Sequence, residues 1–250
     1  MTESPIHLSV VVPVRNGADR LRPHLETLRR YVCAQGRPTE LVLVDDHSEP
    51  DAARLLADFA RSLDGATLLR NDANRGKGFS VARGMAVARG ARRVFTDADL
   101  AYPVEEIDHM VRELEGGADV AIACRVLPES RYLMSPSFFH YLYTRHLLSR
   151  VYNTAVRWSL LPGILDSQAG LKGFTARAAE IVFPRLSIHR FGFDVEALFL
   201  ARRHGLRTAQ VPVSFRYDSE PTTVRFARDG RTLLTDLARV RWNDLRGRYR

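Results

Sequence analysis

The sequence predicts a single α/β domain in which helices flank a mostly parallel β-sheet. Short apolar runs alternate with segments of helical spacing along the first half of the chain. The chain has 250 residues, of which 45% are hydrophobic and 26% charged, with no linker and no repeat of fixed period. Because strands that alternate with helices are joined by crossovers, they form parallel sheets, and this length is enough for one core.

The first half is expected to open with a βαβ unit. A β-rich run at 7–14 precedes a helix at 18–32, in which Leu21, Leu25 and Leu28 follow helical spacing, and an apolar run at 41–44 is the second strand. We then expect a helix around 55–63, a strand at 66–69, a helix at 79–88, a strand at 93–96, a helix at 104–114 and a strand at 120–123.

Polar clusters follow three of these strands. They are residues 13–17, 45–48 and 97–99. Ligand sites of open α/β sheets lie at the carboxyl ends of the strands, so these clusters mark the expected site.

The second half is less regular. A helix-rich stretch covers 137–161, and a helix at 194–203 and a strand at 208–213 follow later. We expect the domain to span residues 1–229 and a basic C-terminal helix or tail to span 230–250.

The two cysteines, Cys33 and Cys124, each lie in an apolar run that is typical of core. They indicate neither a disulfide framework nor a zinc site. Residues 1–7 have no basic segment followed by a long apolar one, which a secretory signal would require, so we expect a cytoplasmic protein.

The formal net charge of +8 favours a polyanionic partner. Nucleic acid, an anionic membrane and a phosphorylated substrate all fit, and the charge alone does not choose among them. Many basic residues lie at 239–250, where a solvated helix face is an equally good explanation.

Asp97 and Asp99 follow an apolar strand and are separated by one residue. Two carboxylates at this spacing point to one side and suit a hard divalent cation, which neutralises a diphosphate. The strand-end position favours a metal site over a chance pair of surface acids.

Two further polar segments have a functional and a structural interpretation. Asp46 directly follows an apolar strand, where it can accept from a base or a ribose, although Asp and Ser also cap helices. Residues 74–78 (NRGKG) join a strand to a helix, so their amides and Lys77 suit an anion, but a simple glycine turn explains them equally. Their spacing differs from that of a P-loop.

Taken together, four motifs resemble the inverting family-two glycosyltransferases. They are 11–16 (VVPVRN), 44–48 (VDDHS), 74–78 (NRGKG) and 96–100 (TDADL), in this order and spacing. The later segments 166–174 (DSQAGLKGF) and 192–196 (GFDVE) resemble the dolichyl-phosphate or polyprenyl-phosphate glucosyl- and mannosyltransferases. The similarity extends over about residues 7–225.

This resemblance implies a GT-A (Rossmann-like) fold, a nucleoside-diphosphate sugar donor and Mg or Mn. By position in the motifs, the donor side would comprise Pro13, Asp46, Lys77, Asp97 and Asp99, of which the last two would hold the metal. The acceptor phosphate would be held by Arg125, Arg145 and Ser149. Arg145 and Ser149 are four residues apart and would share one helix face, and an Arg fork suits a phosphate. A solvent-facing Arg145 is the alternative.

Asp99 and Asp194 are the expected catalytic carboxylates. Asp194 would act as a base for a hydroxyl acceptor or as an organiser for a phosphate acceptor, because a phosphate oxygen is already anionic. A helix N-cap is its structural alternative.

The leading expectation is transfer to a polyprenyl phosphate at the inner face of the membrane. UDP-glucose is favoured over GDP-mannose because 74–78 and 166–168 look more like the glucosyl branch. Apolar residues at helical spacing across 138–156 alternate with basic ones, which fits an interfacial helix, although core packing explains part of them. We expect peripheral membrane contact and no nucleic acid. The alternatives are a hydroxyl acceptor, or an inactive relative that binds lipid or nucleic acid.

Overall fold

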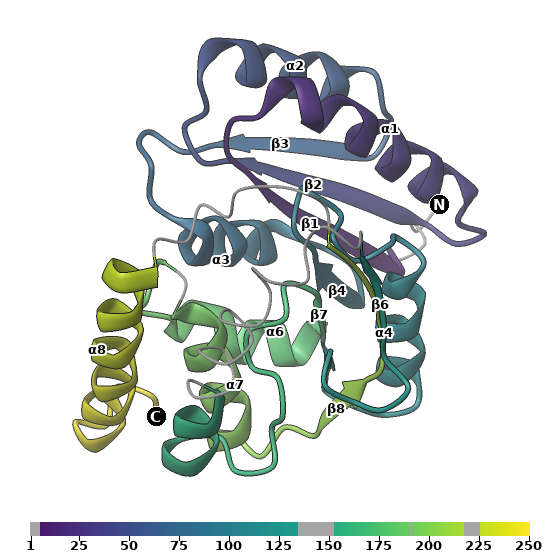
Figure 1. The fold of residues 1–250 in the computed structure, drawn as a ribbon. Coiled ribbons are helices and arrows are strands. Elements are labelled where there is room, and N and C mark those ends of the chain that lie inside the picture. The colour runs from purple at the N-terminus through teal and green to yellow at the C-terminus, as the bar shows by residue number, and fades with distance from the viewer. Residues whose placement is uncertain (1–5, 135–152, 191, 218–225) are drawn as a thin grey trace.

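The computed structural model describes residues 6–134, 153–190, 192–217 and 226–250. Its main sheet contains β1 (Leu8–Val14), β2 (Thr39–Asp45), β3 (Ala66–Arg70), β4 (Arg92–Phe95), β5 (Val120–Ala123), β7 (Lys172–Thr175) and β8 (Thr208–Val211). These seven strands lie in the order β3-β2-β1-β4-β7-β5-β8. Helices cover both faces of the sheet, as Figure 1 shows.

All pairings in this sheet are parallel except those of β7, which runs antiparallel to β4 and to β5. The register places Lys172 opposite Phe95. Because β7 starts where β4 ends, the loop before β7 is brought to the residues that follow β4. The fold thereby joins 166–171 to the Asp97 segment.

The strands β1 and β2 consist of nearly continuous apolar residues because both faces of the sheet are covered. Val10 and Leu41 belong to one hydrophobic cluster, and their neighbours Val11 and Val42 belong to the other. Successive side chains of a strand point to opposite faces, so each strand contributes to both clusters.

The two clusters correspond to two layers of helices. The first layer contains α1 (Ala18–Ala34), α2 (Pro50–Arg61) and α4 (Glu106–Glu115). The second contains α3 (Lys77–Val87), α6 (Ala176–Val182) and α7 (Phe193–Arg203), with η2 (Phe183–Arg185) after α6. The last helix, α8 (Phe226–Leu245), packs on α7 at the outside of this layer (Figure 1).

The sequence pattern did not reveal β7, α6, or a second sheet of β6 (Arg131–Met134) and β9 (Ser214–Tyr217), which pair in parallel. Each has only four to seven residues, and β7 contains a lysine and a glycine in place of an apolar run. The strand expected at 208–213 ends at Val211 because Pro212 has no N–H to donate. Of the helix-rich stretch 137–161, only 153–161 lies within the described residues, and 153–159 is helical.

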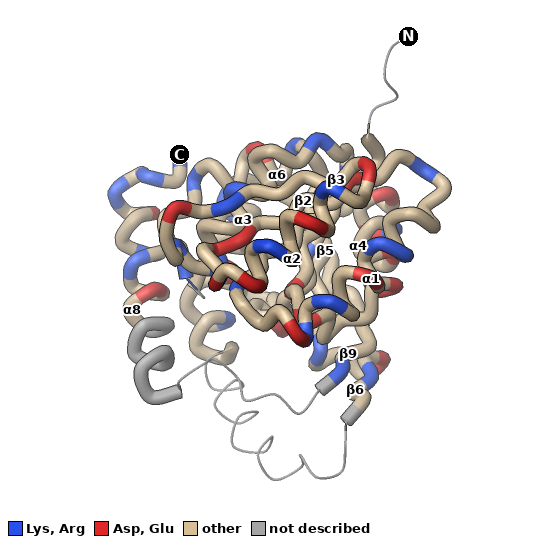
Figure 2. Tube along the Cα trace, turned by 90° about the horizontal axis from the view of Figure 1, so that it is seen from above, with Lys and Arg blue, Asp and Glu red and all other residues tan. Residues whose placement is uncertain are grey.

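The C-terminal segment begins as a helix before residue 230, since α8 starts at Phe226. Val240 and Tyr249 are buried in the second hydrophobic cluster. Basic residues occur on α8 and also on α1 and α2, so the net charge is not confined to the C-terminal segment (Figure 2). No helix in the described part of the chain combines the length and the apolar character that a membrane span requires.

Candidate functional site

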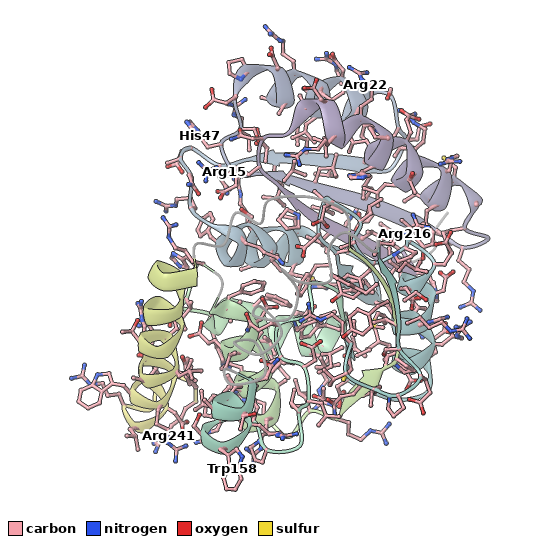
Figure 3. All side chains as sticks on the ribbon, in the orientation of Figure 1. Arg15, Arg22, His47, Trp158, Arg216 and Arg241 are labelled. Carbon is pink, nitrogen blue, oxygen red and sulfur yellow. The ribbon has the colours of Figure 1, made fainter. Side chains whose placement is uncertain are left out.

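The loops after β1, β2 and β4 meet at one edge of the sheet because these strands are parallel. The first two loops are bonded to each other: the backbone N–H of Asn16 donates to Ser48 Oγ at 2.8 Å, and Asn16 Oδ1 accepts from the backbone of Glu49 at 2.9 Å. Figure 3 shows Arg15 and His47 at this edge, one from each loop. The predicted grouping of polar segments is therefore present.

Backbone strain is concentrated in the same loops. Within the described residues, positive φ at a residue other than glycine occurs at Asn16 (60°), His47 (59°) and Leu100 (47°). Each of these residues follows the end of β1, β2 or β4. Such conformations are sparsely populated and tend to persist where a binding or catalytic site over-determines the backbone.

Asp97 lies against two other elements of the site. Its Oδ1 is 2.5 Å from Lys77 Nζ, at the start of α3. Its Oδ2 packs so closely on Gly170 that a Cβ there would lie 2.0 Å from the oxygen. Burial opposes the charge of Lys77, but the carboxylates of Asp97, Asp194 and Asp99 outweigh it and raise the lysine pKa. The charges of Lys77, Asp97 and Asp194 thus lie close together.

Asp99 is exposed to solvent in the same loop, and its Oδ1 accepts from the backbone N–H of Ala101 at 3.1 Å. Crowding by the surrounding protein, followed by the negative charge of Asp97, raises the pKa of the Asp99 carboxyl. A divalent cation would relieve this repulsion between two carboxylates.

The residues present fit a magnesium or manganese ion, which commonly takes one or two carboxylates together with substrate phosphates. Asp97 and Asp99 would supply the carboxylates. Among the described residues there is no group of three His, Cys, Asp or Glu side chains that would enclose a metal by itself.

Asp46 is buried and binds the turn at 74–78, which we call the glycine turn. Its Oδ1 accepts from the backbone N–H of Arg75 and from Asn71 Nδ2, and its Oδ2 accepts from the backbone N–H of Gly76, each at 2.8 Å. Two of the amides that could face an anionic ligand are therefore occupied. Pro13 lies half-buried in β1, opposite Val44.

The segment that precedes α7 covers this turn. The backbone N–H of Phe79 donates to His189 O at 3.2 Å, and a Cβ at Gly76 would lie 2.5 Å from the same oxygen. Gly78 is equally close to Phe193. Glycine is required at 76 because the backbone oxygen of His189 lies against it, and at 78 because Ile188 O and the Phe193 side chain do.

Lys172 and Asp194 form a buried ion pair that the sequence analysis did not identify. Lys172 Nζ donates to Asp194 Oδ1 and to Ala169 O, both at 2.5 Å, and the side chains are 0% and 5% exposed. Burial lowers the pKa of Lys172 and raises that of Asp194, while their mutual attraction opposes both changes. The one signal in the sequence was a lysine at 172, directly after Leu171 and at the start of the segment that forms β7.

Arg125 lies two residues after the end of β5 and forms a two-pronged ion pair with Asp166. Its Nε and Nη2 donate to the two carboxylate oxygens at 2.7 and 2.9 Å. Burial opposes ionisation of Asp166, yet Arg125 holds the pKa of that carboxyl below its ordinary value. The pair leaves Nη1 as the guanidinium nitrogen that Asp166 does not use. Arg145 and Ser149 lie outside the described residues.

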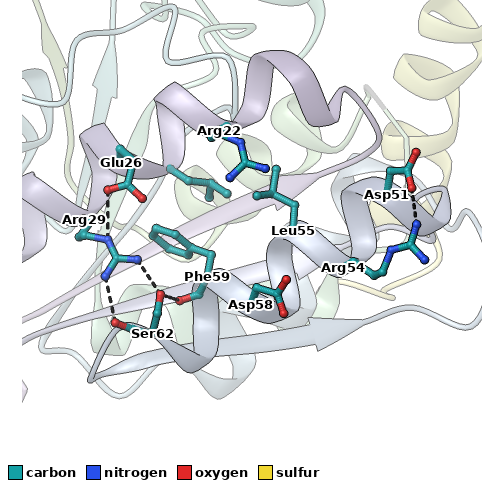
Figure 4. A pocket seen from close by; sticks show the side chains of 10 residues that line it. Arg22, Glu26, Arg29, Asp51, Arg54, Leu55, Asp58, Phe59 and Ser62 are labelled. Carbon is teal, nitrogen blue, oxygen red and sulfur yellow. Dashed lines mark hydrogen bonds and ion pairs between the residues drawn. The ribbon is translucent and has the colours of Figure 1, made fainter.

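A separate surface pocket of about 490 Å³ lies between α1 and α2 (Figure 4). Four of its charged wall residues form two ion pairs: Arg29 Nε is 3.2 Å from Glu26, and Arg54 is 2.5 Å from Asp51. None of the predicted site residues lines it. The strand-end site therefore remains the candidate.

Known proteins resemble this chain in sequence along most of its length. The profile of glycosyl transferase family 2 matches residues 9–169. The dolichyl-phosphate beta-glucosyltransferase of Dictyostelium discoideum is 29% identical over 264 residues, which cover 97% of this chain and 76% of the relative. The Drosophila melanogaster protein of the same name is 30% identical over 227 residues, which cover 85% of this chain and 68% of the relative.

Solved structures share the fold. Glucosyl-3-phosphoglycerate synthase from Mycobacterium tuberculosis, in complex with UDP, has a TM-score of 0.67 at 18% identity and covers 94% of this chain and 80% of its own. The mannosyltransferase PcManGT from Pyrobaculum calidifontis, in complex with GDP-Man and Mn²⁺, has a TM-score of 0.58 at 20% identity and covers 94% and 65%. The expected GT-A fold is confirmed. With the family profile matching more than half of its length and the strand-end motifs assembled in one site, the chain belongs to glycosyl transferase family 2 and is a glycosyltransferase.

Proposed function

We propose that this chain transfers a sugar, with inversion, from a UDP-glucose type donor to a polyprenyl or dolichyl phosphate at the cytoplasmic membrane surface. The similarity to dolichyl-phosphate beta-glucosyltransferases over most of the chain supports this acceptor. GDP-mannose is the alternative donor, and a mannosyltransferase that binds it shares the fold.

On the donor side, Asp97 and Asp99 would hold Mg or Mn, and Lys77 would contact the diphosphate. A bound divalent cation supplies stabilisation of the charge that develops on the leaving nucleoside diphosphate. Lys77 lies 2.5 Å from Asp97, one of the two proposed metal ligands, which supports a role for its ammonium beside the diphosphate. Pro13 and Asp46 would border the base and the ribose, with Asp46 acting through the 75–76 turn that it binds.

On the acceptor side, Arg125, Arg145 and Ser149 would bind the lipid phosphate. Asp166 fixes the guanidinium plane of Arg125 through two hydrogen bonds, which leaves Nη1 for an acceptor oxygen. Arg side chains held in this way match phosphate oxygens in geometry as well as in charge.

The observation that carries the phosphate acceptor is the state of Asp194. Asp194 is 4% exposed, and its Oδ1 accepts a hydrogen bond from Lys172 Nζ. A general base must reach the proton that it removes, and a buried carboxylate bound to an ammonium is poorly placed for that. A phosphate acceptor needs no such base, because its attacking oxygen is anionic near neutral pH. Asp194 then serves to organise the site through Lys172.

Transfer to a hydroxyl is the second candidate. Burial raises the pKa of Asp194, and a raised carboxyl pKa is what a general base near neutral pH requires. In this case Asp194 would have to leave Lys172 or use Oδ2 when the acceptor binds.

A transfer assay with paired acceptors tests the proposal. UDP-glucose and GDP-mannose, each with Mn²⁺, would be offered to a short polyprenyl phosphate and to the polyprenol of the same length. We expect product from UDP-glucose and the phosphate, and none from the polyprenol. Transfer to the polyprenol or another alcohol, with none to the phosphate, would contradict it.

Peripheral contact with the membrane is part of the same proposal. Trp158 and Trp242 are 85% and 54% exposed, and Arg246 stacks 4.4 Å from the ring of Trp242. Aromatic and basic side chains together suit the headgroup region of an anionic bilayer. Sedimentation with phosphatidylglycerol vesicles, and with neutral vesicles as the control, would measure this contact. Equal recovery in the supernatant with both would argue against it.

A further inference from the structure

A buried polar cluster joins the C-terminal segment to α7. Glu196, in the first turn of α7, is 0% exposed, and its Oε1 accepts from Tyr249 OH at 2.5 Å and from Ser187 Oγ at 2.6 Å. Its Oε2 accepts from the backbone N–H groups of Ser187 and Ile188 at 2.9 and 2.8 Å. A buried carboxylate needs such donors to remain in the core.

Asn243 of α8 completes this cluster. Its Nδ2 donates to Ser187 Oγ at 3.0 Å and to Tyr249 OH at 3.1 Å. Tyr249 is 1% exposed, and its backbone oxygen lies 3.0 Å from His204 Nε2. We call Glu196, Ser187, Asn243 and Tyr249 the C-terminal latch.

The segment that the latch holds is the one that covers the glycine turn. Ser187 and Ile188 are bonded to Glu196, and the next residue, His189, accepts from the backbone of Phe79. A Cβ at Gly78 would lie 2.8 Å from Ile188 O, so the latched segment and the turn have no space between them.

The glycine turn also contains Lys77, whose ammonium lies 2.5 Å from Asp97. A second contact also links the C-terminal helix to this region, because Asp236 of α8 packs on Gly192, where a Cβ would lie 2.3 Å from Oδ2. A continuous path of contacts therefore runs from Tyr249 through the buried Glu196, Ser187 and Ile188 to the segment that carries Lys77.

We propose that Tyr249 is a positioning residue for the donor site: through Glu196 and the 187–189 backbone it holds the 76–79 turn, and with it Lys77, in place for the nucleoside diphosphate. This inference rests on the proposed donor role of Lys77. It assigns the C-terminal segment a part in nucleotide binding that is separate from any contact with a membrane.

The matched control is Tyr31, on the opposite layer. Tyr31 is also buried, and its OH donates to the carboxylate of Asp108 at 2.6 Å. Tyr31→Phe and Tyr249→Phe therefore each remove a hydroxyl that donates to a carboxylate, and Tyr249→Phe also removes an acceptor of Asn243. Only the second lies on the path to Lys77.

Two measurements would be made on wild type, Tyr249→Phe and Tyr31→Phe in the full chain. Amide hydrogen exchange over 75–80 reports whether the turn is held. Calorimetric titration with UDP and Mn²⁺ reports nucleotide affinity. For Tyr249→Phe, which removes the hydroxyl bonded to both Glu196 and Asn243, we expect faster exchange over 75–80 and an affinity for UDP lower by about three- to tenfold, as for a net loss of about one hydrogen bond. Tyr31→Phe should change neither.

Unchanged exchange over 75–80 in Tyr249→Phe, or faster exchange with unaltered UDP affinity, would overturn the inference. If wild type bound no nucleotide, the proposed donor would be wrong, while the exchange result would still judge the latch. Asn243→Ala, which removes donors to both Ser187 and Tyr249, is the second variant should Tyr249→Phe not fold. It should show the same two effects.

Discussion

Lys172 Nζ lies 2.5 Å from Asp194 Oδ1, and the pair connects the antiparallel strand β7 to the first turn of α7 inside the protein. The same ammonium binds Ala169 O, next to the glycine on which Asp97 rests. One buried cation therefore links the segment that contacts Asp97 to the segment of Asp194.

Lys172→Met should destabilise the protein strongly. It leaves Asp194 buried without its partner, and removal of one member of a buried ion pair costs about 3 to 5 kcal/mol. Urea denaturation would measure the free energy of unfolding. The double variant Lys172→Met/Asp194→Leu should recover much of the loss, since no uncompensated charge remains. A single variant as stable as wild type would contradict this account of the pair.

Asp194→Asn distinguishes the two acceptors. With a phosphate acceptor, turnover should fall only through altered positioning, and the pH profile should follow the second ionisation of the phosphate near pH ~6. With a hydroxyl acceptor, loss of a general base should lower turnover by about 10² to 10⁴. The pH profile of wild type would then show an acidic limb that the variant lacks. This limb would lie above the ordinary carboxyl pKa, because burial raises the pKa of Asp194.

Asp99→Ala should abolish transfer and leave the fold intact. The residue is exposed and lies in a loop, so its removal takes no volume from the core. Heat stabilisation by UDP and Mn²⁺, compared with UDP alone, would measure the metal contribution, because a ligand of the folded state raises its apparent stability. Full activity of a folded Asp99→Ala protein would refute the metal role.

Gly170→Ala should displace Asp97 and weaken binding of Mn²⁺ with UDP. The added Cβ would lie 2.0 Å from Asp97 Oδ2, closer than any two such atoms can approach. Gly36→Ala is the control, because nothing lies within 4 Å of a Cβ at that position. Calorimetry on both variants would check this; equal affinities would show that the Asp97 loop moves without consequence.

Tyr249→Phe should make stability less sensitive to alkaline pH. Burial, followed by the hydrogen bond to Glu196, raises the pKa of Tyr249 above its ordinary value of about 10. The stability that this group supports is fully present below about pH 10 and is lost as pH rises toward the folded-state pKa, because the unfolded phenol ionises first. Above pH 10, the loss of unfolding free energy with rising pH should become less steep by about 1.4 kcal/mol per pH unit, which corresponds to one proton. An unchanged slope would contradict it.

Much of the fold and part of the site were predictable from sequence. Local pattern revealed the strands that lead to Asp46 and Asp97, because parallel strands buried on both faces are continuous apolar runs. The parallel arrangement then required their ends to meet. Lys77, Asp97 and Asp194 belong to three motifs that are far apart in the chain, and the fold brings their charges close together.

Only the tertiary structure decided how individual charges are used. Sequence placed Asp46 beside a ligand, whereas the folded chain commits both its oxygens to the 75–76 turn and to Asn71. The pairing of Lys172 with Asp194 depends on β7 running antiparallel in a parallel sheet, and a four-residue strand with a lysine carries no periodic signal. Likewise, the sequence indicated only a basic C-terminal helix or tail, and the folded chain shows that Tyr249 in it is buried against Glu196. Hydrophobic periodicity determines which segments are buried, while the partners of buried polar groups depend on contacts between residues distant in sequence.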